Sequence, residues 1–502
     1  MIANWIAWLR ALFFSSLALV CFLVILLFAA ACAKKNGATL PKVGSISNSA
    51  ADFHHSNPVS WRLANGLKVL FFETNELPLV SGKVYFTGGS AWESAANLGS
   101  VSLMGEQLRQ GGTKEIPPSE LDRKLREHAA TINSEFFPEY GSVSFVAPVT
   151  DFEGVFKLFA DVIRKPRFDN ERLEIAKRHL LEGINRRREN PEEIARLLLG
   201  KQLFGDYYLG RYLMPANVAR LNRDLLLAVH SEFVRPNGAI LTVYGDVSES
   251  NLREQVEKLF GDWPAIDLNG PRREAPSIAR ISQKTGVFFI EAPFPQATII
   301  IGKHGPARSD PDRPAFDLVN GILGGGFGSL MMKKIRIELG LSYTAFSQII
   351  PELSVGLNQI FLQTRPETVD AAIGESLKLT LSLQTQPLPD NLLSQVRNKA
   401  SNSWIMRFEN YERVLARKAL QEILQVDPDY DYQYIGKVLG YSADDIAKII
   451  AREWDLSKLT IAVVGDDRVY KGLENLFVNQ SPPPPLNHLN LYRCKFTVEP
   501  VC

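Results

Sequence analysis

The sequence predicts an α+β protein made of two tandem homologous domains, each a mostly antiparallel sheet with one face covered by helices. The first observation is a buried strand that ends in Gly-Asp and occurs twice, in residues 235–247 (RPNGAILTVYGDV) and 456–467 (LSKLTIAVVGDD). The second is that a strand, an amphipathic helix and a long helix precede each copy in the same order, over 137–188 and over 355–408. The repeated glycines stand at 245 and 465, which are 220 residues apart. A period of that length indicates a duplicated domain and not a solenoid.

Composition and charge are those of a globular protein with a large core. The chain has 502 residues, 45% of them hydrophobic and 22% charged, which is enough for two or three domains. A formal net charge of +1 gives no overall attraction to nucleic acid or to anionic lipid. The one dense basic run, at 186–188, is followed by Glu189, Glu192 and Glu193, which is typical of a solvated helix face. We therefore predict no nucleic-acid partner.

Residues 1–35 carry a membrane-directed signal. Residues 11–31 are uncharged and mostly apolar. This run is longer than the roughly 7 to 15 apolar residues of a secretory signal, which favours a spanning helix. The three alanines before Cys32 instead resemble the cleavage box of a bacterial lipoprotein, in which the cysteine carries the lipid. Both alternatives predict an exported protein tethered to the membrane of the cell envelope, either as a periplasmic lipoprotein or through an N-terminal anchor.

The N-terminal domain is predicted at 57–265, after a polar linker at 36–56. Its strand patterns are at 61–63, 67–73, 80–86, 132–148 and 238–245. Asn65-Gly66 between the first two runs predicts a hairpin. One helix carries Leu98, Val101, Met104 and Leu108 at helical spacing, and further helices extend to about residue 205. For the helix at 119–128, Ser119 is the predicted N-cap.

The C-terminal domain is predicted at 281–478, after a linker at 266–280 rich in proline and glycine. A helix at 315–323 leads into GGGFG at 324–328. That run lacks the Lys-Ser/Thr of a P-loop, so we expect a flexible hinge or a loop that faces substrate. Residues 479–502 are predicted to form a Pro-rich tail that contains SPPPP at 481–485. Cys494 and Cys502 in this tail either form a disulfide or remain free thiols.

Residues 103–113 (LMGEQLRQGGT) have the spacing of a zinc motif without its ligands. Histidines at i and i+4 on one helix face, with a glutamate just before the second, would hold zinc and activate its water. Here Leu103 and Gln107 occupy those positions around Glu106. None of the seven histidines stands four residues from another. We therefore expect no metal cofactor in this chain.

The duplication, the strand meander and residues 99–113 together resemble the M16 metallopeptidases, the pitrilysin and insulinase family that includes mitochondrial processing peptidase. Members carry H-x-x-E-H followed shortly by Gly-Thr, and this chain aligns with that motif without a gap through Gly112-Thr113. The resemblance covers about 57–478 and implies a LuxS/MPP-like metallohydrolase fold.

The resemblance also implies roles for single residues in the first domain. Glu106 matches the general base, while Leu103 and Gln107 replace the two zinc-binding histidines. Glu182 corresponds best to the third zinc ligand. Asn133 lies where the family has Asn-Ala, just before the edge strand on which a peptide substrate is laid.

In the second domain, the stretch KKIRIELGLSY resembles the family segment in which an arginine and a tyrosine seven residues later hold the substrate backbone. Arg336 and Tyr343 match both residues. A guanidinium and a phenol can donate hydrogen bonds to the carbonyl oxygens of an extended peptide. The alternative is that Arg336 pairs with a carboxylate such as Glu338 while Tyr343 packs in a sheet.

Two-chain members of the family divide the work: one subunit carries zinc and the other carries the arginine and tyrosine. The chain is similar to the second kind. The resulting hypothesis is a non-catalytic subunit that binds peptide or unfolded protein and pairs with an H-x-x-E-H-containing partner, which holds the zinc of a heterodimeric protease. One alternative is a scaffold or binding protein without a proteolytic role. Another is an autonomous metallopeptidase that uses Glu106 and Glu182 with a non-standard metal.

Overall fold

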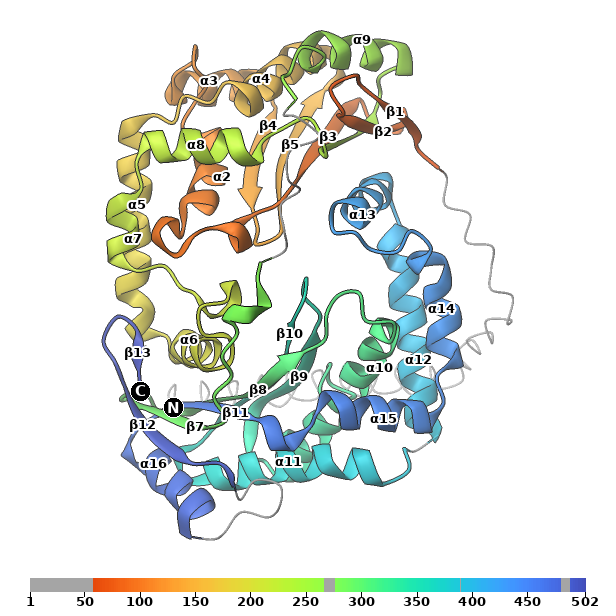
Figure 1. Ribbon diagram of the computed structural model, residues 1–502. Coiled ribbons are helices and arrows are strands. Elements are labelled where there is room, and N and C mark those ends of the chain that lie inside the picture. Colours follow the sequence, from red (N-terminus) through yellow and green to blue (C-terminus); the bar gives the residue numbers. More distant parts are fainter. Residues whose placement is uncertain (1–56, 266–275, 389, 480–487) are drawn as a thin grey trace, which may run out of the picture. The chain divides into compact units, whose positions relative to one another are not determined.

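Two mixed β-sheets, one in each half of the chain, form the framework of the protein (Figure 1). A computed structural model describes residues 57–265, 276–388, 390–479 and 488–502. The predictions for residues 1–35, including a lipid on Cys32, for the linker 36–56 and for most of the linker 266–280 lie outside these residues. Among the described residues, no helix combines the length and the apolar character needed to cross a membrane.

The N-terminal half, residues 57–265, contains a six-stranded sheet in the order β1-β2-β6-β3-β5-β4. Its strands are β1 (Val59–Arg62), β2 (Lys68–Glu73), β3 (Leu79–Thr87), β4 (Thr131–Phe136), β5 (Tyr140–Pro148) and β6 (Ile240–Gly245). β2 and β6 run parallel, and the other neighbours run antiparallel. The hairpin predicted at Asn65-Gly66 joins β1 to β2.

Eight α-helices accompany this sheet in the described part of the N-terminal half. They are α2 (Ser100–Gln110), α3 (Pro118–Glu127), α4 (Phe152–Arg164), α5 (Asn170–Arg186), α6 (Pro191–Phe204), α7 (Pro215–Arg220), α8 (Arg223–Phe233) and α9 (Glu249–Phe260). The prediction that Ser119 caps a helix was wrong. Helix α3 begins at Pro118 with Pro117 as its N-cap. Proline suits a first helical position because its φ is preset and the missing N–H has no intrahelical partner there.

The C-terminal half, from residue 276 onward, repeats this topology in a seven-stranded sheet with the order β13-β12-β7-β11-β8-β10-β9. Its strands are β7 (Gly286–Glu291), β8 (Ala297–Gly305), β9 (Ser342–Ile350), β10 (Gly356–Thr364), β11 (Thr460–Gly465), β12 (Leu491–Phe496) and β13 (Pro500–Val501). Strands β7, β11, β8, β10 and β9 correspond in order to β2, β6, β3, β5 and β4. The parallel pair also recurs, as β7 beside β11. The predicted duplication and the predicted α+β class are confirmed.

The described helices of the C-terminal half are α10 (Arg313–Leu323), α11 (Val369–Thr385), α12 (Asp390–Ile405), α13 (Tyr411–Ile423), α14 (Tyr430–Gly440), α15 (Ala443–Glu453) and α16 (Asp467–Glu474). A π-helical segment, Met332–Glu338, precedes β9. In each half, one face of the sheet packs against helices of the same half in a large apolar core.

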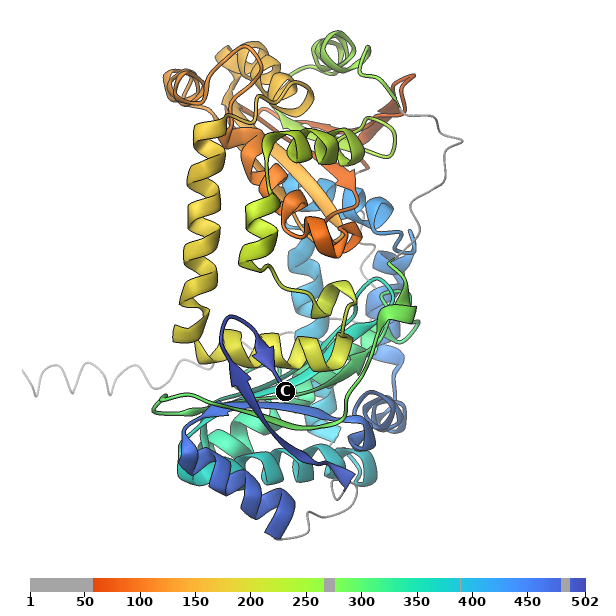
Figure 2. The ribbon, with the colours of Figure 1, turned by 60° about the vertical axis from the view of Figure 1, so that its left-hand side comes forward.

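The last residues of the chain, within the predicted Pro-rich tail, form the strands β12 and β13. β12 pairs parallel with β7 at the edge of the C-terminal sheet, and a disulfide joins Cys494 to Cys502. Of the two alternatives open for these cysteines, the structure has the disulfide. The hairpin of β12 and β13 lies beside α6 (Figure 2). The Tyr212 hydroxyl, from the N-terminal half, donates a hydrogen bond to Glu499 at 3.0 Å. The tail therefore connects the two halves.

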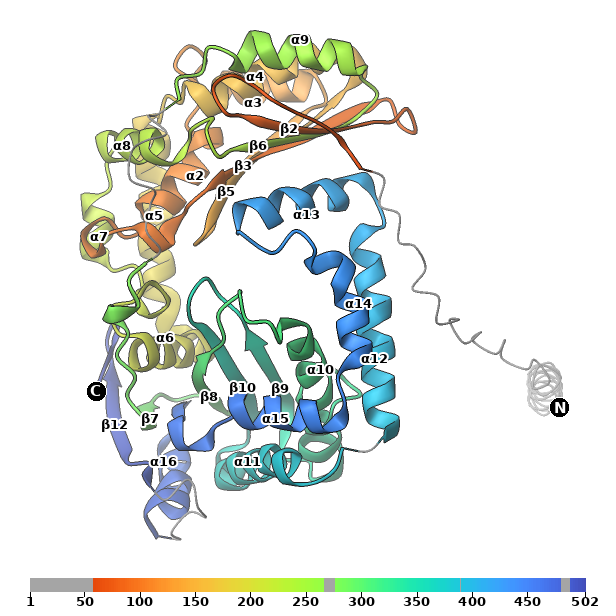
Figure 3. The same cartoon turned by 45° about the vertical axis from the view of Figure 1, so that its right-hand side comes forward.

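Each half also covers the second face of the other half's sheet with one helix. Helix α6 places Leu198, Leu199 and Leu203 against Ile300 of β8 and Val464 of β11. Helix α13 places an equivalent apolar stripe against the N-terminal sheet (Figure 3). The residues of that second contact are Leu70, Phe72, Tyr85 and Ile240 from the sheet and Val414, Leu415, Ala419 and Ile423 from α13. Helices therefore cover both sheet faces, where the sequence predicted one covered face.

Candidate functional site

Helix α2 begins at a glycine and is fixed at its N-terminus by a buried carboxylate. Gly99, the N-cap residue, has a φ of 89°, which costs a side-chain-bearing residue more than glycine. The Glu93 carboxylate accepts hydrogen bonds from the N–H groups of Gly99 at 3.0 Å and Val101 at 2.5 Å. A negative charge stabilises a helix at this end because the first N–H groups lack partners within the helix. Glu93 thus positions the helix that carries the degenerate motif.

The two positions that would bear zinc ligands are part of the core. Leu103 is 2% exposed and belongs to the apolar core of the N-terminal half. Gln107, one turn later, is 0% exposed, and neither atom of its side-chain amide has a hydrogen-bond partner. An unpaired buried amide costs about 1–3 kcal/mol. Both side chains therefore face hydrophobic packing at the place where the family motif has metal ligands.

Close packing holds α2 against the edge strand β4. A Cβ on Gly105 would lie 2.7 Å from the Phe136 ring and 2.9 Å from the Phe136 backbone nitrogen, so only glycine fits at this point of the helix. The Arg109 N–H also donates to the Ser134 hydroxyl at 3.2 Å. The helix and the strand thus form one rigid element.

Glu106 and Glu182 have different surroundings. Burial raises the pKa of Glu106, and the nearby His179 of α5 lowers it by a smaller amount. Glu182 lies three residues after His179, is exposed, and forms an ion pair with Arg186 on its own helix. In the part of the chain that the structure describes, no three His, Cys, Asp or Glu side chains are close enough to hold a metal ion. A leucine without donor atoms, a buried amide and a paired glutamate do not fit the zinc of the family motif.

Asn133 lies on β4, which is the last strand of the N-terminal sheet. Its side chain is exposed, whereas those of its neighbours Ile132 and Phe136 on the same strand are buried. Among the described residues, no strand pairs with the outer side of β4. The backbone groups on that side can therefore receive an extended peptide by β-strand addition.

Arg336 and Tyr343 lie together in the C-terminal half, at the start of the edge strand β9. The guanidinium carbon of Arg336 is 4.6 Å from the centroid of the Tyr343 ring and 5.7 Å from that of Phe327. Glu338 pairs with Lys334 at 3.0 Å and is not the partner of Arg336. Tyr343 is 72% exposed and does not pack inside a sheet. The stacked guanidinium keeps its in-plane N–H groups available as donors.

The apolar surface beside this pair was not predicted from the sequence. Phe327, in the Gly-rich run, is 79% exposed, and Ile337 is 68% exposed. The sequence did contain a signal for this exposure, because a phenylalanine flanked by glycines has few neighbouring side chains to bury it. Together with Arg336 and Tyr343, these side chains make a surface that combines hydrogen-bond donors with apolar groups.

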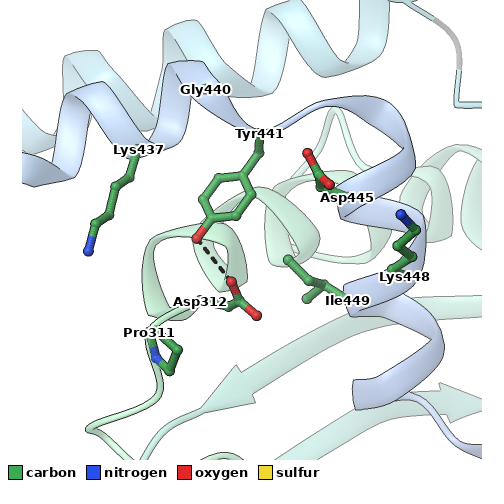
Figure 4. A pocket seen from close by; sticks show the side chains of 8 residues that line it. All are labelled: Pro311, Asp312, Lys437, Gly440, Tyr441, Asp445, Lys448 and Ile449. Carbon is green, nitrogen blue, oxygen red and sulfur yellow. Dashed lines mark hydrogen bonds between the residues drawn. The ribbon is translucent and has the colours of Figure 1, made fainter.

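Two open cavities among the described residues lie elsewhere. One, of about 590 Å³, lies between the start of α10 and helices α14 and α15, where the Tyr441 hydroxyl donates to Asp312 at 3.3 Å (Figure 4). The other, of about 480 Å³, lies beside Glu73 and the segments 149–154 and 246–251, which lead into α4 and α9. None of the residues predicted to form a site lines either cavity. The candidate site is therefore a surface and not an enclosed pocket.

Comparison with known proteins agrees with this architecture. Residues 68–217 match the model of the insulinase family, peptidase family M16, and residues 220–400 match the model of the peptidase M16 inactive domain. An uncharacterized zinc protease of Streptomyces coelicolor is 21% identical over 410 residues, which are 80% of this chain and 88% of that protein. A protein of Helicobacter pylori named a non-peptidase homolog is 20% identical over 405 residues, 80% of this chain and 92% of its own length.

A solved structure shows the same fold. The crystal structure of a peptidase M16 inactive domain from Pseudomonas fluorescens superposes with a TM-score of 0.72 at 23% identity, covering 82% of this chain and 98% of that one. Three observations lead to one conclusion: the matches to the family models, the matching topology of the two sheets, and a motif at 103–113 that aligns without a gap but lacks both histidines. The chain belongs to the M16 family of peptidases and their homologues, with leucine and glutamine where the family's zinc motif has histidines.

Proposed function

We propose that this protein is a non-catalytic M16 subunit that binds extended peptides and pairs with a zinc-bearing M16 partner to form a heterodimeric protease. The observation that carries the proposal is a contrast in exposure. Leu103 and Gln107 are buried at 2% and 0%, whereas Tyr343 is 72% exposed beside Arg336. A chain in this state can hold a substrate that it cannot cut.

The chemistry of the exposed surface supports peptide binding. The Arg336 guanidinium is stacked on Tyr343, so its plane is fixed while its edge is free to donate to carbonyl oxygens. Phe327 and Ile337 offer apolar contact area for substrate side chains. An extended segment can also pair with the free edge of β4, on which Asn133 lies.

Pairing with a partner and attachment to the envelope complete the proposal. The non-peptidase name of the Helicobacter pylori relative supports a chain without its own activity. A zinc-bearing subunit would then supply the hydrolytic step. The apolar run at 11–31 and Cys32 support export and tethering to the membrane. The mass of the mature N-terminus distinguishes a lipidated cysteine from an uncleaved anchor.

Peptide binding is tested with a fluorescein-labelled unstructured peptide and the full chain in detergent. Arg336→Ala combined with Tyr343→Phe should weaken binding at least tenfold, because the double variant removes the guanidinium and the phenolic donor. Lys334→Ala is the matched control, since Lys334 lies in the same π-helical segment and pairs with Glu338. Unchanged affinity in the double variant would contradict the assigned site.

Catalytic pairing is tested by reconstitution with an H-x-x-E-H-containing M16 chain. The pair should cleave the peptide, and the double variant should lower that cleavage without preventing assembly. Cleavage by this chain alone, with tightly bound zinc, would contradict the proposal. Stable assembly without cleavage for any zinc-bearing M16 partner would favour the scaffold alternative.

A further inference from the structure

Two glutamates that occupy equivalent turns of the duplicated halves meet at the junction between them. Glu139 follows Pro138 in the turn from β4 to β5, and Glu352 follows Pro351 in the turn from β9 to β10. Because β4 and β5 correspond to β9 and β10, the Pro-Glu turns correspond as well. Each turn ends the edge strand of its sheet.

A single guanidinium and several hydrogen bonds hold these carboxyl groups together. Arg308, which follows β8, forms an ion pair with Glu139 and a second, at 3.6 Å, with Glu352. The Leu353 N–H donates to Glu139 at 3.1 Å, and the Tyr208 hydroxyl donates to the same oxygen at 3.2 Å. Glu139 is also close enough to Glu352 to raise the pKa of the Glu352 carboxyl. We call Glu139, Glu352 and Arg308 the carboxyl junction.

The junction is buried and has one more acid than base. The side chains of Glu139, Arg308 and Glu352 are 7%, 13% and 28% exposed. The other titratable groups that face Glu139 and Glu352 are the phenols of Tyr207 and Tyr208, which belong to the N-terminal half. Neither phenol carries charge near neutral pH, so Arg308 neutralises one carboxylate and a proton must neutralise the second.

We propose that the carboxyl junction is a proton-controlled contact between the two edge-strand hairpins, closed while Glu352 donates a shared proton to Glu139 and loosened once both carboxyls are ionised. It connects the hairpin that carries Asn133 with the hairpin that begins beside Tyr343. It does not depend on the peptide-binding role proposed above. Its consequence is a pH-dependent opening of the contact between the halves.

The direction of the effect follows from proton binding. Burial, and then the neighbouring Glu139, raise the pKa of Glu352 from 4.5 to about 7. The closed junction therefore holds a proton up to about pH 7, whereas an opened Glu352 releases it near 4.5, so rising pH favours opening over this window. Burial also acts to raise the pKa of Glu139, but Arg308 outweighs it and the net pKa is lowered, so Glu139 titrates below this window.

Hydrogen exchange of the two turns measures the opening. For the full chain in detergent, exchange rates are divided by the intrinsic rates at each pH. With pKa values of about 7 closed and 4.5 open, the opening constant should rise about tenfold from pH 6 to pH 8 and change little above that. The effect should be confined to peptides that contain Glu139 or Glu352. A change of less than twofold would overturn the proposal.

Glu352→Gln tests the shared proton, because the amide keeps a donor for Glu139 and cannot ionise. Its opening constant should be independent of pH between 6 and 8, while Glu76→Gln, an exposed glutamate in the turn between β2 and β3, should behave as the unmodified chain. An unchanged pH dependence in Glu352→Gln would overturn the proposal.

A measurement on the unmodified chain covers a variant that fails to fold. Carboxyl ¹³C signals of glutamate-labelled protein should include one that titrates above pH 6. A full set of glutamates that titrate below pH 5.5 would overturn the proposal.

Discussion

In each half, a helical segment joins two corresponding strands, β3 to β4 in the first half and β8 to β9 in the second. The two segments differ in which of their side chains are exposed. Between β3 and β4, the chain turns Leu103 and Gln107 into the core at 2% and 0% exposure. After β8, it presents Phe327 and, at the start of β9, Tyr343 at 79% and 72% exposure, with Arg336 stacked between them. One topology therefore buries the motif positions on α2 in the first half and exposes residues that follow α10 in the second half.

The difference shows what happens to a metal site when its ligands are lost. A leucine in a ligand position gains by joining the adjacent core, since each buried apolar square ångström contributes about 25 cal/mol. The glutamine beside it follows into the core but finds no partner for its amide. The second half has an apolar core of its own, but Phe327 and Tyr343 remain outside it.

The largest effect that tests this comparison is expected from restoring the histidines. Leu103→His combined with Gln107→His should destabilise the fold by about 3–5 kcal/mol, because an imidazole replaces core packing and must lose its hydration. Zinc should not compensate, since Glu182 is exposed and paired with Arg186. Denaturant unfolding and the metal content of the purified variant check both parts. Stoichiometric zinc with unchanged stability would show that the site is only dormant.

A smaller effect of opposite sign is expected from removing the unpaired amide. Gln107→Leu should stabilise the protein by about 1–2 kcal/mol, because the buried amide has no hydrogen bond to lose. Gln384→Leu is the matched control: its amide donates to the Trp454 carbonyl at 2.8 Å, so the same substitution should destabilise. If both variants lost stability, Gln107 would have a partner, and the contrast between the halves would weaken.

Much of this architecture was predictable from periodicity alone. Strands such as Ile240–Gly245 and Thr460–Gly465 are mostly apolar runs. In helices such as Phe152–Arg164, apolar side chains recur every three to four residues. The same periodicity shows that α6 and α13 each have an apolar face. It does not show that this face packs against the sheet of the other half. Strand β12 follows a proline run that obscured it, and its pairing with β7 depends on contacts distant in sequence.

The candidate site was predictable only where chemistry and spacing coincide. The spacing of Arg336 and Tyr343 led to a pair that is stacked in the structure. For Glu182, spacing gave an exposed residue that pairs with Arg186 on its own helix. The two Pro-Glu turns are visible in the sequence, but their meeting across the junction requires the folded halves.

The smallest effect concerns Glu106, the family's general base retained beside two lost ligands. If the N-terminal site is inert, Glu106→Gln should leave peptide cleavage by the reconstituted pair unchanged, which is not expected of a residue that activates water. Burial raises the pKa of Glu106, so its charge opposes folding as pH rises through the raised value. The side chain is only half-buried, so the gain in stability at pH 8 should not exceed about 0.5 kcal/mol and should vanish at pH 4, where both states are protonated. Thermal unfolding at the two pH values measures it. A fall in cleavage of a hundredfold or more would instead assign catalysis to the half of the duplication whose ligand positions are buried.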